Sequence, residues 1–367
     1  MNLWTQLRNN TLARMGAILL LIFYTLVICA DWVAPYDPYF SEASSALLPP
    51  TQVYWRDHQT QDWIGPHVYP TQQGALDLNT GDRTLIVDWE QPSPIVFGAK
   101  GFTHRFLLWT VDRHLLGTTN PDAKFHWLGT DDQGRDQFSR LLYGGRISLS
   151  IGIVGIAISF PLGMLVGGIS GYFGGLVDTI VMRLVEVLMT IPTIYLLVAL
   201  AAVLPDGLNS AQRFLLIVLI TSFVSWAGLA RVIRGQVLSL KTQEFVQAAQ
   251  AMGGRSFYII LRHVLPQTYT YVIISATLAI PGFIGAESVL SLIGLGIQQP
   301  DPSWGNLLSV ATNASILILQ PWLVWPPALL IILTVLSFNL LGDGLRDALD
   351  PRNLSASNSF GTEIERS

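Results

Sequence analysis

Six stretches of this chain are apolar over about the length that a helix needs to cross a lipid bilayer. A bilayer core takes roughly 20 residues of helix at about 1.5 Å per residue. We expect the spans at residues 15–34, inside 147–177, near 187–204, at 214–230, at about 267–286 and at about 320–342. Only 13% of the residues are charged, against about 25% in soluble domains, so much of the surface has to face lipid. The sequence predicts an all-α polytopic membrane protein with six transmembrane helices.

The first stretch also has features of a secretory signal peptide, because Arg8 and Arg14 precede a short apolar core. Ile28 and Ala30 do not form the small-x-small pair of a cleavage site, so we expect an uncleaved anchor. The short loop between the fourth and fifth spans carries five basic residues: Arg231, Arg234, Lys241, Arg255 and Arg262. Basic residues favour cytoplasmic loops, so we expect both termini in the cytoplasm.

A second compositional region separates the first two spans. It holds five of the six histidines and many prolines, and runs such as Thr84–Trp89 and Pro94–Phe97 are typical of strands bounded by turn residues. We therefore expect a β-containing extracytoplasmic insert. The expected organisation is a cytoplasmic N-terminus and first span (1–34), an extracytoplasmic domain (35–146), a five-helix membrane core (147–342) with a cytoplasmic loop (235–266), and a cytoplasmic tail (343–367).

Several functions are excluded by what the chain lacks. A net charge of −4 with only three lysines leaves no basic block for nucleic acid. The single cysteine, Cys29, cannot form an intrachain disulfide or a cysteine-based metal cluster. The one Lys-Thr pair, Lys241-Thr242, follows no glycine-rich phosphate loop, so another chain has to hydrolyse any ATP. No nucleophile–base arrangement suggests an enzyme, and we expect no bound cofactor.

An acidic cluster before the second span could suggest a calcium loop. Asp131, Asp132 and Asp136 do not have the ligand spacing of an EF-hand, and Arg135 is placed to neutralise them. The histidines of the insert show no helical i, i+4 pair, and we expect them to be scattered over a polar surface: His58, His67, His104, His114 and His126. We predict no metal site.

Ionisable residues near spans are functional candidates by default. Arg183 and Glu186 are three residues apart, which favours a structural ion pair. Glu287, at the outer end of the fifth span, could face a translocation pathway or a partner subunit. Glycines at four-residue steps permit close helix packing in lipid, and we expect them to contact a second membrane chain: Gly163, Gly167, Gly171 and Gly175.

The cytoplasmic loop contains a predicted helix over about 243–252. Thr242 could cap it, and Gly253-Gly254 should end it. Four residues share one face at i, i+3, i+4 and i+7 spacing: Phe245, Ala248, Ala249 and Met252. A helix this short is marginal alone, so it either docks on another protein or lies on the membrane surface.

The sequence of this loop resembles that of a known family. Ala248-Ala249, Gly253 and Leu265-Pro266 resemble the EAA loop of binding-protein-dependent ABC importer permeases, with Gln247 where Glu is common. Further segments resemble the second of the two permease types in dipeptide and oligopeptide systems: 128–136, 171–175, 287–296, 302–305 and 339–351. Residues 41–125 depart from the family, whose members usually have a shorter connection.

The resemblance implies a non-catalytic permease in a bacterial inner membrane. Its partners would be a second, homologous permease, two cytoplasmic ATP-binding subunits that hold ATP and Mg²⁺, and an extracytoplasmic solute-binding protein. The loop would be the coupling helix, with these contact residues: Glu244, Phe245, Ala248, Ala249, Met252, Gly253, Leu265 and Pro266. Peptides are the expected solutes, and similar permeases carry nickel complexes or glutathione. An ion-driven secondary transporter is the alternative, but it predicts acidic relays and an inverted repeat that the sequence does not show.

Overall fold

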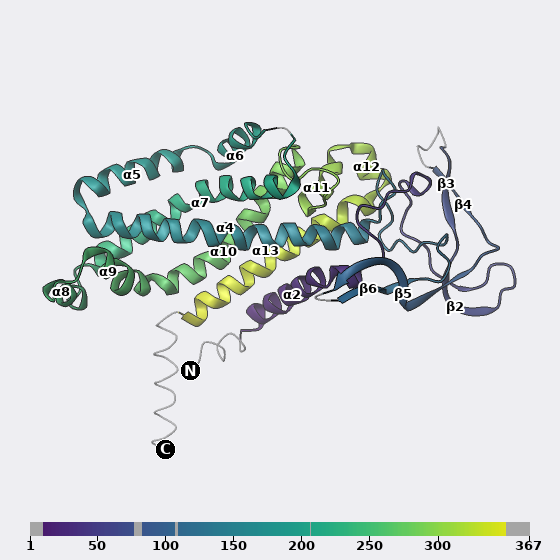
Figure 1. The fold of residues 1–367 in the computed structure, drawn as a ribbon, viewed down its shortest axis with the longest axis horizontal. Coiled ribbons are helices and arrows are strands. Elements are labelled where there is room, and N and C mark those ends of the chain that lie inside the picture. The colour runs from purple at the N-terminus through teal and green to yellow at the C-terminus, as the bar shows by residue number, and fades with distance from the viewer. Residues whose placement is uncertain (1–9, 77–82, 107–108, 206, 350–367) are drawn as a thin grey trace, which may run out of the picture. The chain divides into compact units, whose positions relative to one another are not determined.

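A computed structural model describes residues 10–76, 83–106, 109–205 and 207–349, and within these it is mostly helical (Figure 1). The long helices are α2 (Thr11–Ile28), α4 (Gln137–Phe173), α5 (Gly175–Thr190), α6 (Thr193–Ala202), α7 (Ser210–Leu240), α10 (Tyr269–Leu292) and α13 (Pro321–Leu349). The shorter ones are α3 (Ala30–Val33), η1 (Ala43–Ser45), α8 (Glu244–Ala251), α9 (Ser256–Ile259), η2 (Ile260–Val264), η3 (Leu265–Thr268), α11 (Trp304–Leu308), η4 (Ser309–Thr312) and α12 (Ala314–Leu319).

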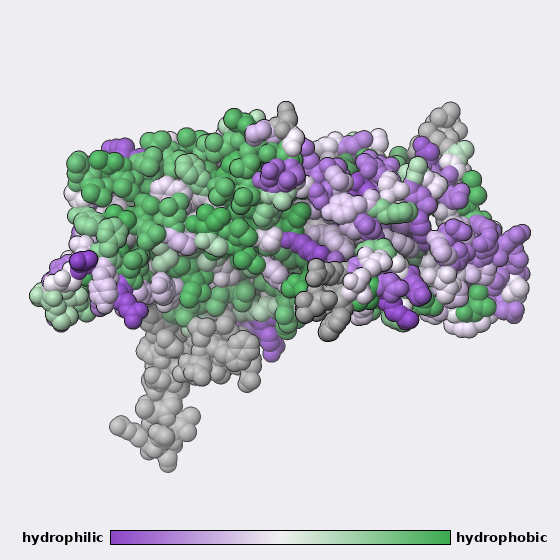
Figure 2. Space-filling model, in the orientation of Figure 1, coloured by the Kyte–Doolittle hydropathy of each residue, from purple (hydrophilic) through white to green (hydrophobic). Residues whose placement is uncertain are grey.

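Helices long and apolar enough to cross a membrane confirm the predicted class. Among the described residues there are five such helices, counting 256–292 as one, and six spans if the bent pair α5–α6 is one. Figure 2 shows hydrophobic side chains gathered over α5, α6 and α7, and hydrophilic ones over the strands of the insert. On α5, Leu176, Ile180, Leu184 and Val187 form an exposed apolar stripe, as expected for a helix facing lipid.

The third span is not the straight helix that we predicted near 187–204. α5 and α6 meet at 87°, with Ile191 and Pro192 between them. The proline ring disfavours helical backbone at the residue before it, and Ile191 is extended (φ −77°, ψ 125°). The apolar run conceals this bend because hydropathy does not respond to backbone geometry.

Two other boundaries differ from the prediction. α4 begins at Gln137, about ten residues earlier than expected, because the Asp136 carboxylate accepts the Ser139 N–H (2.7 Å) and caps the helix there. α13 continues to Leu349, beyond the expected end at 342. The rest of the predicted C-terminal tail, from residue 350, lies outside the described residues.

The insert contains strands at both predicted runs, within β4 (Arg83–Val87) and β5 (Ser93–Phe106), and four further strands among the described residues. β1 (Tyr54–Arg56), β2 (Trp63–Val68), β5 (Ser93–Phe106) and β6 (Trp109–Thr118) form an antiparallel sheet in the order β1-β2-β5-β6. β3 (Thr71–Leu76) pairs with β4 (Arg83–Val87). A small core of Val68, Ala123 and Phe125 and a cluster of Tyr54, Tyr69 and Trp89 rings stabilise it.

Packing divides the chain into two compact parts. One is formed by the described residues up to Leu21, by Ile151–Ala286 and by those from Leu333 onward. The other is formed by Ile22–Ser150 and Glu287–Ile332 and includes the insert. In the first part, α5 and α7 lie side by side (Figure 1).

Candidate functional site

The short helix α8 lies where the sequence predicts it, at Glu244–Ala251. Thr242 does not cap it: the Thr242 hydroxyl donates to the Ser239 carbonyl (2.9 Å), and the N-cap is Gln243, without a side-chain hydrogen bond. The predicted stop is confirmed, because Gly253 has φ +80° and donates its N–H to the Gln250 carbonyl (2.9 Å). This left-handed backbone is the one that glycine adopts at little cost.

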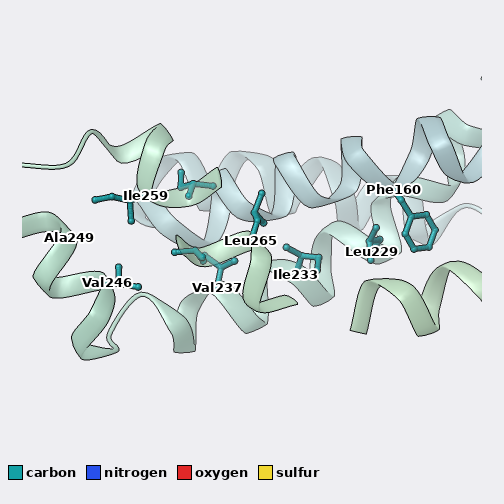
Figure 3. Packing of buried hydrophobic residues seen from close by; sticks show 10 residues of the cluster. Phe160, Leu229, Ile233, Val237, Val246, Ala249, Ile259 and Leu265 are labelled. Atoms are coloured by element: carbon teal, nitrogen blue, oxygen red, sulfur yellow. The ribbon is translucent and has the colours of Figure 1, made fainter. Parts of the chain in front are cut away.

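One face of α8 packs on its own chain. Val246 and Ala249 are buried in a cluster with Val237, Ile259 and Ile260 (Figure 3). The predicted stripe is therefore divided: Ala249 points inward and is 5% exposed, so its assignment as a partner contact is wrong in this structure. The physical reason is that α9 and η2, which follow α8 directly, cover this side of the helix.

The other face of α8 is exposed. Phe245 is 42% exposed, Met252 is 82% exposed, and Ala248 is also exposed. The following elements, α9 and η2, add three exposed apolar side chains: Phe257, Tyr258 and Leu261. We call these six residues the α8 patch. Exposed apolar side chains grouped in one loop favour a protein or membrane contact.

Hydrogen bonds join α8, and the residue that caps the end of α7, to the end of α4. The Gln250 amide donates to the Tyr172 hydroxyl (3.0 Å), and the Lys241 ammonium donates to the Gly171 carbonyl (2.9 Å). Next to them, Arg234 of α7 pairs with Asp178 of α5. A displacement of α8 would therefore pull on α4 and α7 together. The sequence reasoning missed these links because they join residues more than 50 positions apart.

The segment after α8 holds the two last predicted contact residues. Leu265 is buried in the same cluster, and Pro266 is half-buried in η3. Proline has no N–H to donate, and the helix changes here from the π-helix η2 to the 3-10 helix η3. Both residues therefore anchor the loop to the spans, and neither belongs to the α8 patch.

Three of the stepped glycines pack within this chain. A Cβ on Gly163, Gly167 or Gly171 of α4 would lie 2.4–2.9 Å from the carbonyl oxygens of Trp226, Ala230 and Arg234, which follow the same four-residue step along α7. Our expectation that they contact a second membrane chain is wrong for these three. Gly175 starts α5 with φ +54°.

An open groove of about 520 Å³ lies among the helices of the first compact part, which includes Ile151–Ala286. Its wall includes Phe160 of α4, Thr193 of α6, Ser225 of α7 and Tyr271 and Ser275 of α10. None of the described residues that line it is charged. The wall is apolar with scattered hydroxyl groups.

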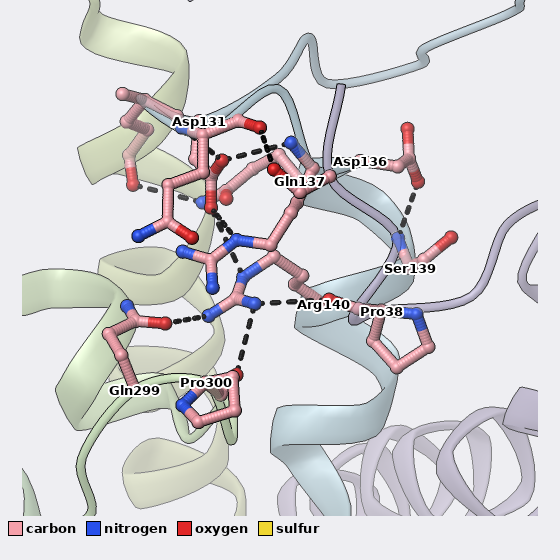
Figure 4. A network of polar contacts seen from close by, with 12 residues as sticks. Pro38, Asp131, Asp136, Gln137, Ser139, Arg140, Gln299 and Pro300 are labelled. Carbon is pink, nitrogen blue, oxygen red and sulfur yellow. Dashed lines mark hydrogen bonds and ion pairs between the residues drawn. The ribbon is translucent and has the colours of Figure 1, made fainter. Parts of the chain in front are cut away.

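Arg140 lies at the centre of a buried polar network in the other part (Figure 4). Its guanidinium donates to the carbonyls of Pro38 and Pro300 (3.1 and 3.2 Å) and to the Gln299 amide oxygen (2.7 Å). It also pairs with Asp131 at 3.5 Å. The network ties the segment before the first strand of the insert to the start of α4 and to the segment after α10.

The acidic cluster is neutralised as predicted for Asp131. Arg135 Nε donates to the Asp131 carboxylate (2.7 Å). The Asp136 carboxylate forms a hydrogen bond with His126 Nδ1 (2.7 Å), and Asp132 is exposed. Within the described residues no three His, Cys, Asp or Glu side chains lie close enough to hold a metal ion.

The histidines of the insert are mostly not on the surface. His58 is exposed, but the other four are buried: His67, His104, His114 and His126. They stack on aromatic rings or on each other, as His104 and His114 do at 4.7 Å. Burial and the neighbouring His104 hold the pKa of His114 below its usual value, although the hydrogen bond to the Phe102 carbonyl acts in the opposite direction.

Glu287 is fully buried, so the prediction that it faces a pathway or partner is not met in this structure. One of its carboxylate oxygens accepts hydrogen bonds from Ser291 and Ser303 (2.7 Å each). A Cβ on Gly305 would lie 2.5 Å from the Ser288 Cα, so the Pro302–Gly305 motif lets α11 approach α10 closely. The predicted Arg183–Glu186 ion pair is confirmed at 3.0 Å, on an exposed face.

Comparison with known proteins gives consistent matches. Residues 159–355 match the family described as binding-protein-dependent transport system inner membrane component, and residues 2–50 match the N-terminal transmembrane domain of oligopeptide transport permease C. The dipeptide transport system permease protein DppC of Bacillus subtilis (strain 168) is 42% identical over 244 residues, which are 66% of this chain and 74% of the relative. OppC of Haemophilus influenzae is 44% identical over 243 residues (66% and 76%), and OppC of Escherichia coli (strain K12) is 42% identical over 228 residues (62% and 73%).

Proposed function

Because this chain belongs to the binding-protein-dependent transport system inner membrane components, we propose that it is the permease subunit of an ATP-driven importer of dipeptides or oligopeptides. Such permeases are non-catalytic membrane components without cofactors, and ATPase partners bind the ATP. Membership of this family favours an ATP-driven importer over an ion-driven secondary transporter. Peptides are the solutes named for the relatives, which favours them over nickel complexes or glutathione.

The finer assembly is part of the same proposal. The chain works with a second, homologous permease, two cytoplasmic ATP-binding subunits and an extracytoplasmic binding protein. Both termini and the loop 235–266 lie in the cytoplasm, since the basic residues gather there. The insert, within 35–146, lies on the opposite side, and the membrane core comprises 147–342.

The single observation that carries the coupling role is the two-sided packing of α8. Val246 and Ala249 fix the helix to its own chain, and the α8 patch faces outward. An anchored helix with an exposed apolar face can transmit a push from a partner, because it cannot move without its anchor. The link from Gln250 to Tyr172 carries that movement to α4.

The groove supports the pathway role. Its uncharged wall offers weak hydroxyl contacts and no fixed charge that would trap a peptide of opposite sign. Transport needs contacts weak enough for the solute to leave. We assign this groove as the contribution of this chain to the pathway.

Met252→Glu tests the coupling role. The side chain is 82% exposed, so the charge should leave the fold of the chain intact while opposing an apolar contact with the ATPase. We expect the variant to reach the membrane in normal amounts but to retain at least tenfold less ATPase on purification. Gln247→Glu is the matched control: it adds the same charge to an exposed position of the same helix, where the family often has Glu, and should retain the ATPase.

Two results would contradict the assignment. Normal ATPase retention by Met252→Glu would show that the α8 patch is not the contact. Equal losses in both variants would show that any added negative charge repels the partner.

A further inference from the structure

The hairpin of β5 and β6 belongs to a segment that neither family match covers, since these span residues 2–50 and 159–355. The family function therefore does not account for it. A cavity of about 680 Å³ opens between this hairpin and the chain at Pro35–Phe40 and Thr118–Lys124. Cavities that hold small ligands usually measure about 300–1,000 Å³.

The lining of this cavity is apolar over most of its area. Val96 and Phe102 come from β5, and Leu116 comes from β6. Phe40 comes from the segment that follows α3. Each of these side chains is partly exposed, so the surface is available to a ligand. An apolar wall with a few convergent polar groups is the usual form of a ligand site.

Two of the cationic residues that line the cavity have no partner. Lys100 and Arg113 are directly opposite each other in the register of β5 and β6, and neither forms an ion pair or hydrogen bond within the described part of the chain. Like charges in this position repel each other. The Arg113 guanidinium lies near Gly98, which also lines the cavity, with about 4.0 Å between its Nη1 and a Cβ at that glycine.

The other charged residues of the lining are already engaged. Lys124 pairs with Glu42 at 2.8 Å and lies over the Phe40 ring. Asp37 is the one acidic residue that lines the cavity, and its carboxylate accepts the N–H of Tyr39 (2.8 Å). That hydrogen bond leaves the negative charge of Asp37 in place, so Lys100 and Arg113 give the lining a net positive charge, and an anion between them would relieve their repulsion.

We propose that this cavity binds short peptides by their C-terminal carboxylate. The carboxylate lies between Lys100 and Arg113, where Arg supplies a paired hydrogen-bond geometry, and the last apolar side chain of the peptide packs on Phe102 and Leu116. Every unmodified peptide carries this group whatever its sequence. The cavity would therefore bind peptides of many sequences outside the membrane. The inference rests on the proposed function for the identity of the solute.

The test is a titration of the purified full-length chain, in detergent and without its binding protein, with the tripeptide Ala-Ala-Phe. We expect binding that weakens with added salt and that is at least tenfold weaker for the C-terminal amide of the same peptide. Lys100→Gln combined with Arg113→Gln should abolish the difference between acid and amide. The matched control is Arg56→Gln with Arg83→Gln, which removes the same charge from exposed strand positions outside the cavity and should bind as the unaltered chain does.

Equal affinity for acid and amide would overturn the proposal, as would the same loss in the control variant or no binding at millimolar peptide. Failure of the proposed function gives a different result. In that case the unaltered chain, assembled with its partners, imports no peptide, whatever the titration shows.

Discussion

Gly253 and Gly235 differ in one respect that decides their roles. A Cβ at either position would meet no atom within 4 Å, so space does not require glycine at either one. Gly253 has φ +80°, whereas Gly235 lies within the helix α7 and has no positive φ. Any difference between substitutions at the two positions therefore reports backbone conformation alone.

Gly253→Ala should displace α8. Alanine in the left-handed region costs about 1–2 kcal/mol, and the turn can escape this strain by moving the helix that it ends. Since about 1.4 kcal/mol is a tenfold change in an equilibrium, we expect about tenfold weaker ATPase association, measured by co-purification at graded ATPase concentrations.

Gly235→Ala is the control for this substitution and should be neutral or stabilising by about 0.5–1 kcal/mol, as in other helix interiors. If both variants associate normally, the geometry after α8 does not position the α8 patch, and this part of the account fails.

At the scale of elements, α4 and α7 are joined by close backbone contact. Gly163, Gly167 and Gly171 of α4 approach the carbonyls of α7, and Lys241, which follows α7, donates to the Gly171 carbonyl at the end that leads to α8. In lipid, small residues permit the close approach that stabilises helix pairs. These two helices thus form the rigid unit on which the loop is mounted.

Gly167→Ala tests this unit. The added methyl would lie 2.4 Å from the Ala230 carbonyl oxygen, so the helices have to separate, at about 1–3 kcal/mol for an overpacked site. We expect a lower thermal midpoint of the purified chain, followed by tryptophan fluorescence. Gly285→Ala, inside α10, introduces the same methyl into open space and should leave the midpoint unchanged or slightly raised. Equal midpoints for both variants would show that α4 and α7 do not depend on the close approach.

At the scale of the whole molecule, the sequence predicted what depends on hydropathy and on local turn chemistry. The apolar stretches, the strand runs at 84–89 and 94–97, and the stop at Gly253 follow from such patterns, although β5 continues to Phe106, beyond the predicted run. It did not predict which face of α8 points inward, because helical spacing cannot tell an internal contact from an external one. Val246 and Ala249 are three residues apart, and this spacing was the available signal that they share one face of the helix. Nothing in the sequence identified α9 as the element that covers that face.

The same limit explains the buried histidines and the stepped glycines. His67 and His114 are buried because strands far apart in the sequence pair around them. The glycine spacing correctly indicated a close helix contact, but the partner was α7 of the same chain. Long-range pairing, which a single sequence does not reveal, decides both cases.

The most direct measurement of the central claim is peptide uptake into liposomes that contain this chain with its partner permease and ATPases, with ATP enclosed and the binding protein outside. We predict uptake of labelled peptide that requires both ATP and this chain, and that falls at least tenfold when the chain carries Met252→Glu. Uptake that continues without ATP and follows an ion gradient would contradict the account, as would the absence of uptake by the complete, unaltered assembly.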